Sequence, residues 1–353
     1  MKINASIALL GSLVSLLSLT TFAQDTELSE HIETIINAEP IKRVPPSYPI
    51  SAAKKGQEGW ARVSFVIDKE GNVIDPIIMD SSGLDAFEKE SLRAVKRWKY
   101  SPALQNGEAI EQCQVSVQLD FMLNGKQGVT RQFLRKYKDV IDAIEAQNLE
   151  LAAVQLDELE QDKLWNHTES GYFWLADSMY AKHVGDSKRE LKSVSRALSS
   201  NDDAFKRPTR LYLLNRQTVL FINDTQYANA LNSYQKLVKE DEEGTYSASI
   251  KPFSDKINEL LHSSESMTRE LQMGSSGGIN HYLSRSSFAL QIKDDGVLDE
   301  VEVRCANKRS RFTASENSEW RIPEAWGQCT LFVTGSPDTQ FNIIELGAYT
   351  GEI

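Results

Sequence analysis

The spacing of apolar residues changes twice along the chain, and these changes set the number of folded units. Residues 39–124 alternate strand and helix patterns, residues 130–265 carry helical spacing with few Gly or Pro, and residues 280–353 return to strand patterns. Breaking residues mark both changes, with Asn124-Gly125 at the first and the stretch from Gly274 to Gly278 at the second. One hydrophobic core seldom serves about 300 residues. The sequence therefore predicts an α+β multidomain protein of three units joined by linkers.

The N-terminus has the pattern of a secretory signal peptide. Lys2 precedes an apolar run from Ile7 to Leu19, and Ala23 occupies a cleavage-determining position. The run is interrupted by serines and is shorter than the roughly 20 residues of a membrane-spanning helix. We therefore expect residues 1–23 to be removed and the mature chain to lie free in the periplasm, without stable membrane insertion. A retained inner-membrane anchor that faces the periplasm is the alternative.

Charge and motifs argue against several classes of function. The net charge of -11 provides no basic field that would attract nucleic acid or an anionic membrane. The histidines show no pair at metal-ligand spacing and no glycine loop suits a dinucleotide or phosphate, so we expect neither a metal nor a cofactor. Ser276 lies in a Gly-x-Ser-x-Gly match, but a hydrolase needs a strand before that serine and a helix after it. We expect a helix before Ser276 and a loop after it. A linker is therefore favoured, a serine hydrolase is the least favoured alternative, and no catalytic residue is predicted.

The first unit predicts a small antiparallel sheet with one packed helix. Alternating apolar residues indicate a strand at Ala61 to Ile67, and Val73 to Met79 returns from it through a Gly-containing turn. Ser81-Ser82-Gly83 offers an N-cap for a helix whose apolar positions run from Leu84 to Trp98. A last strand, Gln112 to Leu123, closes the sheet.

Residues of this unit match a known pattern in both identity and spacing. The matches include Pro46-Ser47-Tyr48-Pro49, Glu58-Gly59, Phe65-Val66-Ile67, Asp68, Gly71, Ser81-Ser82-Gly83, Phe87, Ala94-Val95, Trp98 and Tyr100-Ser101-Pro102-Ala103. Residues 39–124 thereby resemble the TonB C-terminal domain family. The resemblance implies the same sheet-and-helix fold and a role in binding envelope proteins.

The resemblance also implies where a partner binds. In TonB-like domains an extended partner peptide adds to an edge formed by the Tyr-Pro segment and the last strand, which here are Val44 to Pro49 and Gln112 to Leu123. The candidate partner-binding residues are Pro46, Tyr48, Pro49, Val115, Val117 and Leu119. The alternative is that Tyr48 and Pro49 only pack the incoming chain onto the sheet. Pro45 departs from the polar residue of energy-transducing relatives, because it has no N–H to donate.

The middle unit, residues 130–265, resembles tetratricopeptide repeats, in which two antiparallel helices occupy about 34 residues. The central match comprises Phe173-Trp174-Leu175-Ala176, Tyr180, Gly185-Asp186, Leu191 and Arg196-Ala197-Leu198. Flanking helices are predicted at Phe133 to Glu145, Leu149 to Leu159, Leu211 to Phe221 and Tyr227 to Val238, with a closing helix near Ile250 to Leu261. We expect about three helix pairs whose stacking forms a groove for proteins or peptides.

The last unit, residues 280–353, predicts a small all-β domain with a disulfide. Phe288 to Ile292 and Val297 to Val303 alternate apolar residues, and Asp294-Asp295-Gly296 predicts the turn between them. Because the chain is expected to be exported, two of its three cysteines should be paired. We predict a disulfide between Cys305 and Cys329, which would contribute about 3 kcal/mol. Cys113 lies on the apolar face of the last strand of the first unit and should be a buried thiol.

Two functions remain in view. The first is a non-catalytic periplasmic adaptor that binds envelope proteins through the sheet edge and the helical groove. The second is a component of TonB-dependent energy transduction that reaches an outer-membrane receptor. The resemblance implies a long Pro-rich spacer for such a transducer, whereas residues 24–38 form only a short amphipathic lead with apolar positions that include Ile35 and Ile36.

Overall fold

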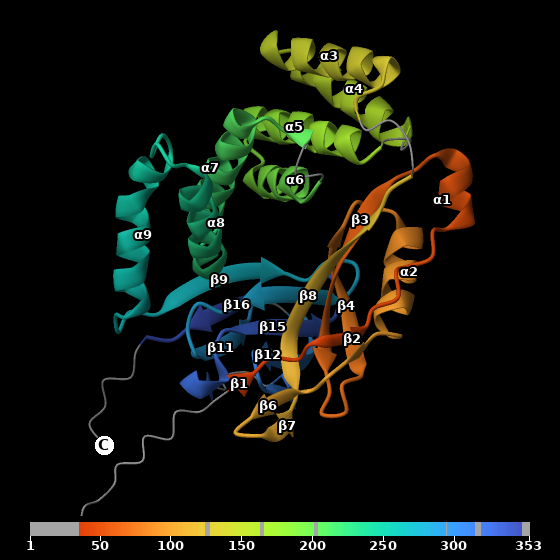
Figure 1. Cartoon of the computed structure of the whole chain (residues 1–353). Helices are drawn as coiled ribbons and strands as arrows, with labels where there is room; N and C mark the ends of the chain where they lie inside the picture. The colour runs from red at the N-terminus through yellow and green to blue at the C-terminus, as the bar shows by residue number, and fades with distance from the viewer. Residues whose placement is uncertain are drawn as a thin grey trace, which may run out of the picture.

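The computed structural model describes residues 35–123, 128–162, 166–200, 204–293, 295–314 and 319–347. In Figure 1 the chain forms three parts, namely a sheet with a helix packed on it, a stack of helices, and a domain of two further sheets. The predicted signal peptide and most of the predicted lead lie outside the described residues, as do Asn124-Gly125 and Asp294. Within the described ranges, no helix is long and apolar enough to cross a bilayer.

The first part is built on an antiparallel sheet with the strand order β4-β3-β8. Its strands are β3 (Gly59–Ile67), β4 (Val73–Ser81) and β8 (Gln112–Phe121), and helix α2 (Asp85–Val95) packs across one face. Shorter elements surround it: β1 (Ile35–Ile36), β2 (Pro40–Lys42), α1 (Ile50–Lys55), β5 (Lys99–Tyr100), β6 (Ala103–Gln105) and β7 (Glu108–Ile110). The predicted sheet with one packed helix is therefore present.

The central strand β3 is buried because both faces of the sheet are covered. Phe65 on the α2 face meets the Trp98 ring edge-on, with the ring centroids 5.9 Å apart. The Trp98 indole N–H donates to the Val44 carbonyl at 2.7 Å, so the chain that leads into the domain is fixed to its core. Gly71 is required in the β3–β4 turn, because its φ is +79° and a Cβ there would lie 1.9 Å from the Tyr100 carbonyl oxygen.

The predicted serine N-cap of α2 is wrong. The N-cap residue is Leu84, which has no side-chain cap. The two serines instead serve the sheet, since the Ser82 hydroxyl accepts a hydrogen bond from the Trp60 N–H at 3.1 Å and Ser81 donates to Glu88 at 2.5 Å. They tie the end of the β3–β4 hairpin to the start of α2.

The predicted amphipathic lead also differs where the structure describes it. Ile35 and Ile36 form β1, which pairs antiparallel with Gln105 and Leu104 of β6. Both isoleucine side chains are exposed. Pairing with a strand about 70 residues away therefore decides the local structure, and apolar spacing alone does not predict it.

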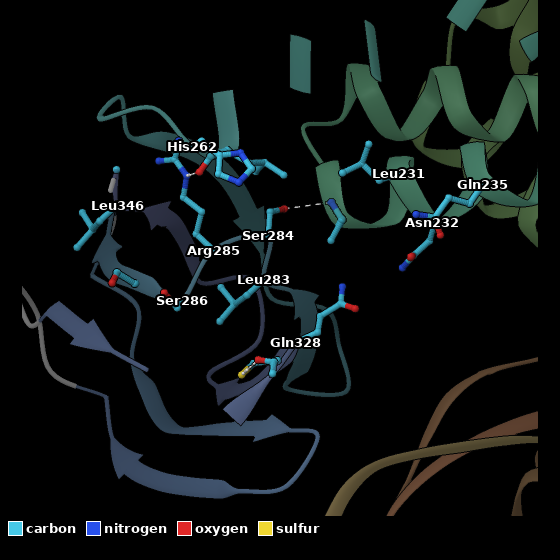
Figure 2. A pocket seen from close by; sticks show the side chains of 16 residues that line it. Leu231, Asn232, Gln235, His262, Leu283, Ser284, Arg285, Ser286, Gln328 and Leu346 are labelled. Atoms are coloured by element: carbon cyan, nitrogen blue, oxygen red, sulfur yellow. Dashed lines mark hydrogen bonds between the residues drawn. The ribbon is translucent and has the colours of Figure 1, made fainter. Parts of the chain in front are cut away.

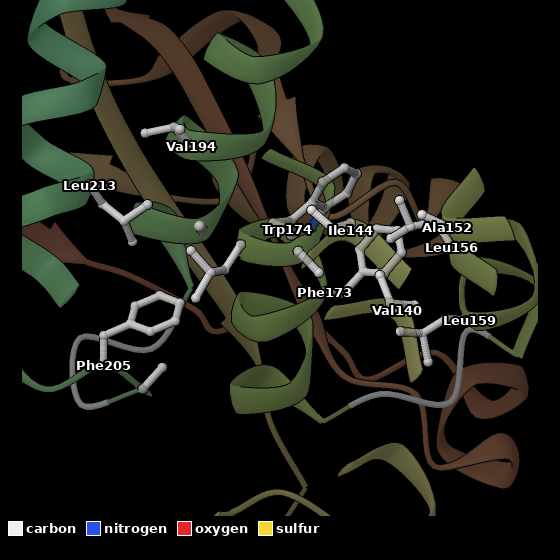
Figure 3. Packing of buried hydrophobic residues seen from close by; sticks show 14 of the residues in the cluster. Val140, Ile144, Ala152, Leu156, Leu159, Phe173, Trp174, Val194, Phe205 and Leu213 are labelled. Carbon is white, nitrogen blue, oxygen red and sulfur yellow. The ribbon is translucent and has the colours of Figure 1, made fainter. Parts of the chain in front are cut away.

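The middle part consists of helices that pack in sequence order. They are α3 (Arg131–Glu145), α4 (Leu149–Asp162), α5 (His167–Val184), α6 (Ser187–Ser199), α7 (Arg207–Asn223), α8 (Tyr227–Glu240) and α9 (Ser247–Leu261). Figure 3 shows the apolar side chains that successive helices contribute to one continuous core, among them Ile144 from α3, Leu156 from α4 and Phe173 from α5. The helices lie where the sequence places them, and their kinship with tetratricopeptide repeats stays a prediction.

Capping residues explain the boundaries of the central helix pair. The Asn166 side chain accepts a hydrogen bond from the Glu169 N–H at 2.9 Å, and the Glu169 carboxylate accepts one from the Asn166 N–H at 3.2 Å. The two hydrogen bonds form a capping box at the start of α5. Gly185 ends α5 in the left-handed region with φ +76°. Asp186 then caps α6 through the Arg189 N–H at 2.9 Å.

The last part consists of two antiparallel sheets with the orders β10-β15-β12-β13 and β14-β11-β16-β9. The strands are β9 (Met267–Gln272), β10 (Gly278–Tyr282), β11 (Ser287–Ile292), β12 (Leu298–Cys305), β13 (Arg309–Thr313), β14 (Glu319–Arg321), β15 (Cys329–Gly335) and β16 (Gln340–Glu345), with a 3₁₀ turn η2 (Glu324–Trp326) before β15. Phe288 and Phe341 lie in the core between the sheets. We refer to residues 267–347 as the C-terminal β domain.

The glycine-rich segment is not a linker between two parts. It forms the turn between β9 and β10, and β9 already pairs with β16, so this domain begins at Met267 rather than at residue 280. The Gly277 carbonyl accepts a hydrogen bond from the Gly335 N–H at 3.0 Å, which holds the turn inside the domain. Helix α9 is therefore joined to the β domain through only residues 262–266.

The cysteines are arranged as the sequence predicts. Cys305 at the end of β12 lies opposite Cys329 at the start of β15, and the two sulfurs are joined at 1.97 Å. Cys113 is a free, buried thiol in β8. Burial, together with the nearby Glu111 carboxylate, raises the pKa of Cys113 to about 12, so the thiol is protonated at neutral pH.

The three parts contact one another through polar side chains. Arg196 of α6 pairs with Asp80 of β4 at 2.9 Å. Arg269 of β9 pairs with Asp224 at the end of α7 at 2.7 Å. The helices therefore contact both the sheet of the first part and the C-terminal β domain.

Candidate protein-binding site

Strand β8 lies at the edge of its sheet and pairs with a neighbouring strand on one side only. Its partner is β3, and the register is continuous from Gly59↔Phe121 to Phe65↔Val115. Throughout the described chain, residues 114–121 make no backbone hydrogen bond to any strand or loop other than β3. Alternate N–H and C=O groups along these residues therefore face away from the sheet, as on any edge strand. We call residues 114–121 the β8 edge.

The three strand residues predicted for partner binding face inward. Val115, Val117 and Leu119 are half-buried and pack against the core around Phe65 and Val63. Their side chains anchor β8 to its own sheet. Only the backbone of these positions is left to a partner, so sequence specificity would have to come from other side chains.

The segment before the sheet packs onto the domain. The Tyr48 ring meets Phe87 and Phe121 edge-on at centroid distances of 5.8 and 5.9 Å, and its hydroxyl donates to the Gln57 carbonyl. Desolvation, with a smaller contribution from Glu58, raises the pKa of Tyr48 to about 12. Pro46 and Pro49 on either side are half-buried. The packing role predicted as the alternative therefore has a structural counterpart, while a role of these residues in partner binding stays a prediction.

The opposite edge of the same sheet is irregular. In β4, Asp75 and Pro76 lie across from the single residue Phe65, which is a β-bulge, and Asp75 has a φ of +46°. Pro76 has no N–H to offer to a further strand. A bulge and a proline are the means by which natural sheets block unwanted pairing at an edge.

Both ends of β8 are held by other parts of the chain. At its start, the Cys113 N–H donates to the Ala306 carbonyl of the C-terminal β domain at 3.0 Å. At its end, the Gln118 side chain donates to the Ser199 carbonyl of α6 at 2.8 Å. Between these two contacts Ser116 is exposed. In Figure 1 the C-terminal sheets lie on the side of β8 away from β3, in agreement with contacts between β8 and β12.

A second concave surface lies between the helices and the C-terminal β domain. It is a cleft of about 760 Å³ with an apolar floor that includes Leu231 and Leu283. Figure 2 shows Asn232 on α8 and Gln328 beside β15 on opposite walls of this space. Gln235 joins them on α8, and within the described residues none of these three carboxamides has a hydrogen-bond partner. The cleft continues along α8 into a groove against α9.

The charged groups of this cleft are already engaged. The Arg285 guanidinium donates to the Leu260, Leu261 and Glu265 carbonyls at the end of α9. The His262 Nδ1 atom contacts the Asn258 carbonyl at 2.7 Å. The surface left to a ligand is therefore apolar and carboxamide in character rather than ionic.

Among the positions considered from the sequence that the structure describes, no catalytic or metal-binding groups come together. Ser276 lies in the β9–β10 turn, which is followed by a strand and not by the helix that a nucleophile elbow needs. Among the described residues no cluster of three His, Cys, Asp or Glu side chains is suited to a metal ion. His167 and His281 are both buried and each contacts a carboxylate, Asp120 and Glu345 respectively.

Known proteins are similar to part of this chain. Residues 44–123 match the family model described as Gram-negative bacterial TonB protein C-terminal. Protein TonB from Vibrio cholerae is 34% identical over 83 residues, which cover 24% of this chain and 34% of that protein. Protein tonB2 from Pseudomonas aeruginosa is 34% identical over 88 residues, which cover 25% of this chain and 32% of that protein.

Two solved structures are similar to part of this chain. The solution structure of the Pseudomonas aeruginosa TonB C-terminal domain is 25% identical, covers 26% of this chain and 91% of that chain, and has a TM-score of 0.24. The structure of the tonb2 protein from Vibrio anguillarum is 31% identical, covers 35% of this chain and 99% of that chain, and has a TM-score of 0.22. The chain spans about a third of the length of the first curated relatives. Its residues 44–123 are a TonB C-terminal domain.

Proposed function

We propose that the protein is a non-catalytic, periplasmic protein-interaction protein that captures an extended segment of an envelope protein by strand addition to the β8 edge. The observation that carries this proposal is the backbone of residues 115–121, which is regular and is paired on its inner side only. In strand addition the main-chain hydrogen bonds provide much of the affinity. The match of residues 44–123 to TonB C-terminal domains supports the same role.

The β8 edge is already ordered in the form that strand addition needs. The strand is held in place by its continuous register with β3 and by the inward packing of Val115, Val117 and Leu119. A partner segment would therefore be ordered on a rigid template, and only the partner would lose conformational entropy on binding. Each outward N–H and C=O pair would gain a hydrogen bond in exchange for water.

The cleft between α8, α9 and the C-terminal β domain is a second proposed contact. Its apolar floor and the carboxamides of Asn232, Gln235 and Gln328 suit an uncharged, extended peptide, since a carboxamide both donates to and accepts from peptide groups. Two such surfaces in one chain would let it hold two segments at once, which supports an adaptor role for the helical part.

Photo-crosslinking in the periplasm of a diderm bacterium tests the first surface. We would place a photoreactive phenylalanine at Ser116 on β8 and, as the matched control, at Met79 on β4. The proposal predicts a partner adduct from Ser116 and none from Met79. Equal adducts from both positions, or none from Ser116, would reject strand addition at β8.

A component of TonB-dependent energy transduction is the second candidate. It is favoured by the matched relatives, which are named Protein TonB and Protein tonB2. Such a role needs an anchor in the inner membrane, so the two candidates differ in the fate of residues 1–23. N-terminal sequencing of the protein from fractionated cells separates them, because a mature chain that begins near Gln24 excludes force transmission and an intact Met1 in the inner membrane supports it.

A further inference from the structure

The C-terminal β domain reaches β8 at the point where the regular pairing of β8 with β3 stops. Between Val115 and Gln112 the register with β3 shifts by one residue, so Cys113 lies in a bulge. Its N–H donates to the Ala306 carbonyl at 3.0 Å. The position that a partner strand would need in order to continue past Val115 is therefore already taken by the chain itself.

Side chains reinforce this backbone contact. The Gln114 carboxamide bonds to the Thr330 hydroxyl of β15 at 2.8 Å. With its oxygen turned toward Thr330, the same carboxamide also reaches the Thr330 N–H and the Gln328 carbonyl at 3.2 Å each. Gln114 thus occupies backbone groups at the start of β15, which ties the beginning of the β8 edge to the C-terminal β domain.

An ion-pair cluster fixes the same junction. Arg309 of β13 pairs with Glu111, just before β8, at 3.1 Å and also contacts the Asp75 carboxylate of β4. Arg311 reaches Asp75 at 3.1 Å. Arg304, which is 1% exposed and paired with Glu302, donates to the Asp75 carbonyl at 3.0 Å. The strained Asp75 backbone is therefore clamped by arginines of the C-terminal β domain.

We propose that the C-terminal β domain caps the β8 edge, so that a partner strand can pair freely only with the seven residues from Val115 to Phe121 and must displace Ala306 to extend further. This inference rests on the proposed strand addition. In this arrangement the partner and the C-terminal β domain of the same chain compete for the start of β8. Loss of the arginine cluster should shift the competition toward the partner.

Cys113 provides a reporter for the cap. The thiol is fully buried beside Glu111 and Arg309, and it is the chain's single free cysteine when the disulfide between Cys305 and Cys329 is intact. Its alkylation by iodoacetamide therefore requires the junction to open. The rate of this reaction measures opening without any knowledge of the partner.

The test combines this rate with crosslinking from Ser116 in the full chain. We would compare the natural chain with Arg309→Glu, the milder Arg309→Gln, and the control Arg321→Glu, which makes the same charge change on β14 of the other sheet. Thermal unfolding checks that each variant is folded. The cap predicts that Arg309→Glu alkylates about tenfold faster and gives a several-fold larger adduct, that Arg309→Gln is intermediate, and that Arg321→Glu is unchanged.

Three outcomes would overturn the cap in different ways. An unchanged alkylation rate in Arg309→Glu means that the arginine cluster does not close the junction. Faster alkylation with an unchanged adduct means that the junction opens but does not compete with the partner, which leaves strand addition intact. The absence of an adduct from Ser116 in every variant rejects strand addition itself and the cap with it.

Discussion

The two edge strands of the first sheet, β4 and β8, share one neighbour but differ in how regular their outer edges are. Strand β4 contains Pro76, a left-handed Asp75 and two register shifts against β3. Strand β8 has neither Pro nor Gly and keeps a continuous register over most of its length. One edge is therefore blocked by its own backbone, while the other is regular and is closed only where a second domain docks.

This difference shows two ways of controlling a sheet edge. A proline and a bulge block pairing permanently, because they remove donors and bend the strand. A docked domain blocks pairing reversibly, because its hydrogen bonds and ion pairs can be exchanged for those of a partner. An edge that is kept regular is the one expected to be used, since an unused regular edge carries a risk of aggregation.

The largest effect is expected when β8 is made to resemble β4. Ser116 and Val117 are neighbours in β8. The N–H of one therefore faces β3, and the N–H of the other faces outward. Proline at the outward-facing position should reduce the partner adduct more than about tenfold, because one outward donor is lost and the strand is bent. Crosslinking from Met122, which is exposed just after β8, measures this loss.

The control is a proline substitution at the other of these two positions. Proline at the position whose N–H donates to β3 should lower the free energy of unfolding by about 1–3 kcal/mol, because a hydrogen bond within the sheet is lost. Adducts that survive both substitutions in folded protein would show that the β8 backbone does not bind the partner.

The reverse change is to make β4 resemble β8. Pro76→Val restores a donor on β4 and should allow weak self-association through that edge, with a Kd of about 0.1 mM, or roughly -5.5 kcal/mol. Sedimentation velocity over a range of concentrations measures it, with Pro102→Val outside β4 as a control. A chain that stays monomeric up to millimolar concentration would mean that Asp75 and its bulge are sufficient to block this edge.

A smaller effect is expected from pH at the docked end of β8. Burial alone would raise the pKa of Asp75, but the hydrogen bond from Arg309 and the charges of Arg311 and Arg304 lower it below its ordinary value of 3.8. A lowered carboxyl pKa stabilises the docked form above about pH 4, and this stabilisation is lost as the pH falls through the lowered pKa. The exchange protection of the Cys113 amide should therefore be constant from pH 7 to about 5 and fall several-fold near pH 3.

Asp75→Asn provides the comparison for this titration. The amide does not titrate, so the protection of the Cys113 amide in this variant should be lower at neutral pH and nearly independent of pH. A natural chain with flat protection down to pH 3 would mean that Asp75 does not contribute to docking.

The smallest predicted effect separates packing from binding at Tyr48. Tyr48→Phe removes the hydrogen bond to the Gln57 carbonyl but keeps the ring contacts with Phe87 and Phe121. We expect a loss of about 1 kcal/mol in unfolding free energy by urea titration and an unchanged adduct from Ser116. A large drop in adduct at unchanged stability would instead assign the hydroxyl to the partner interface.

Local patterns were enough to predict most of the elements. The alternation around Phe65 and the helical spacing around Phe173 place β3 and α5 correctly, although both elements are buried on more than one face. The strand at Ile36 was not predictable in this way, since it exists only through pairing with β6. The resemblance to TonB C-terminal domains predicted the β8 edge as a binding surface, but it did not predict the cap.

The cap depends on contacts between residues that are distant in sequence. Arg309 and Asp75 are 234 positions apart, and neither residue is unusual in its local context. One local signal was present, since Pro76 lies inside an apolar strand pattern and indicates an edge. It identifies the blocked edge and thereby points to β8 as the other one.

The most direct test of the account is residue-resolved amide hydrogen exchange of the whole chain with and without its crosslinked partner. We expect the outward amides of residues 115–121 to gain protection and the amides of β4 to be unchanged. Protection gained on β4, or only along α8, with β8 unchanged would contradict it.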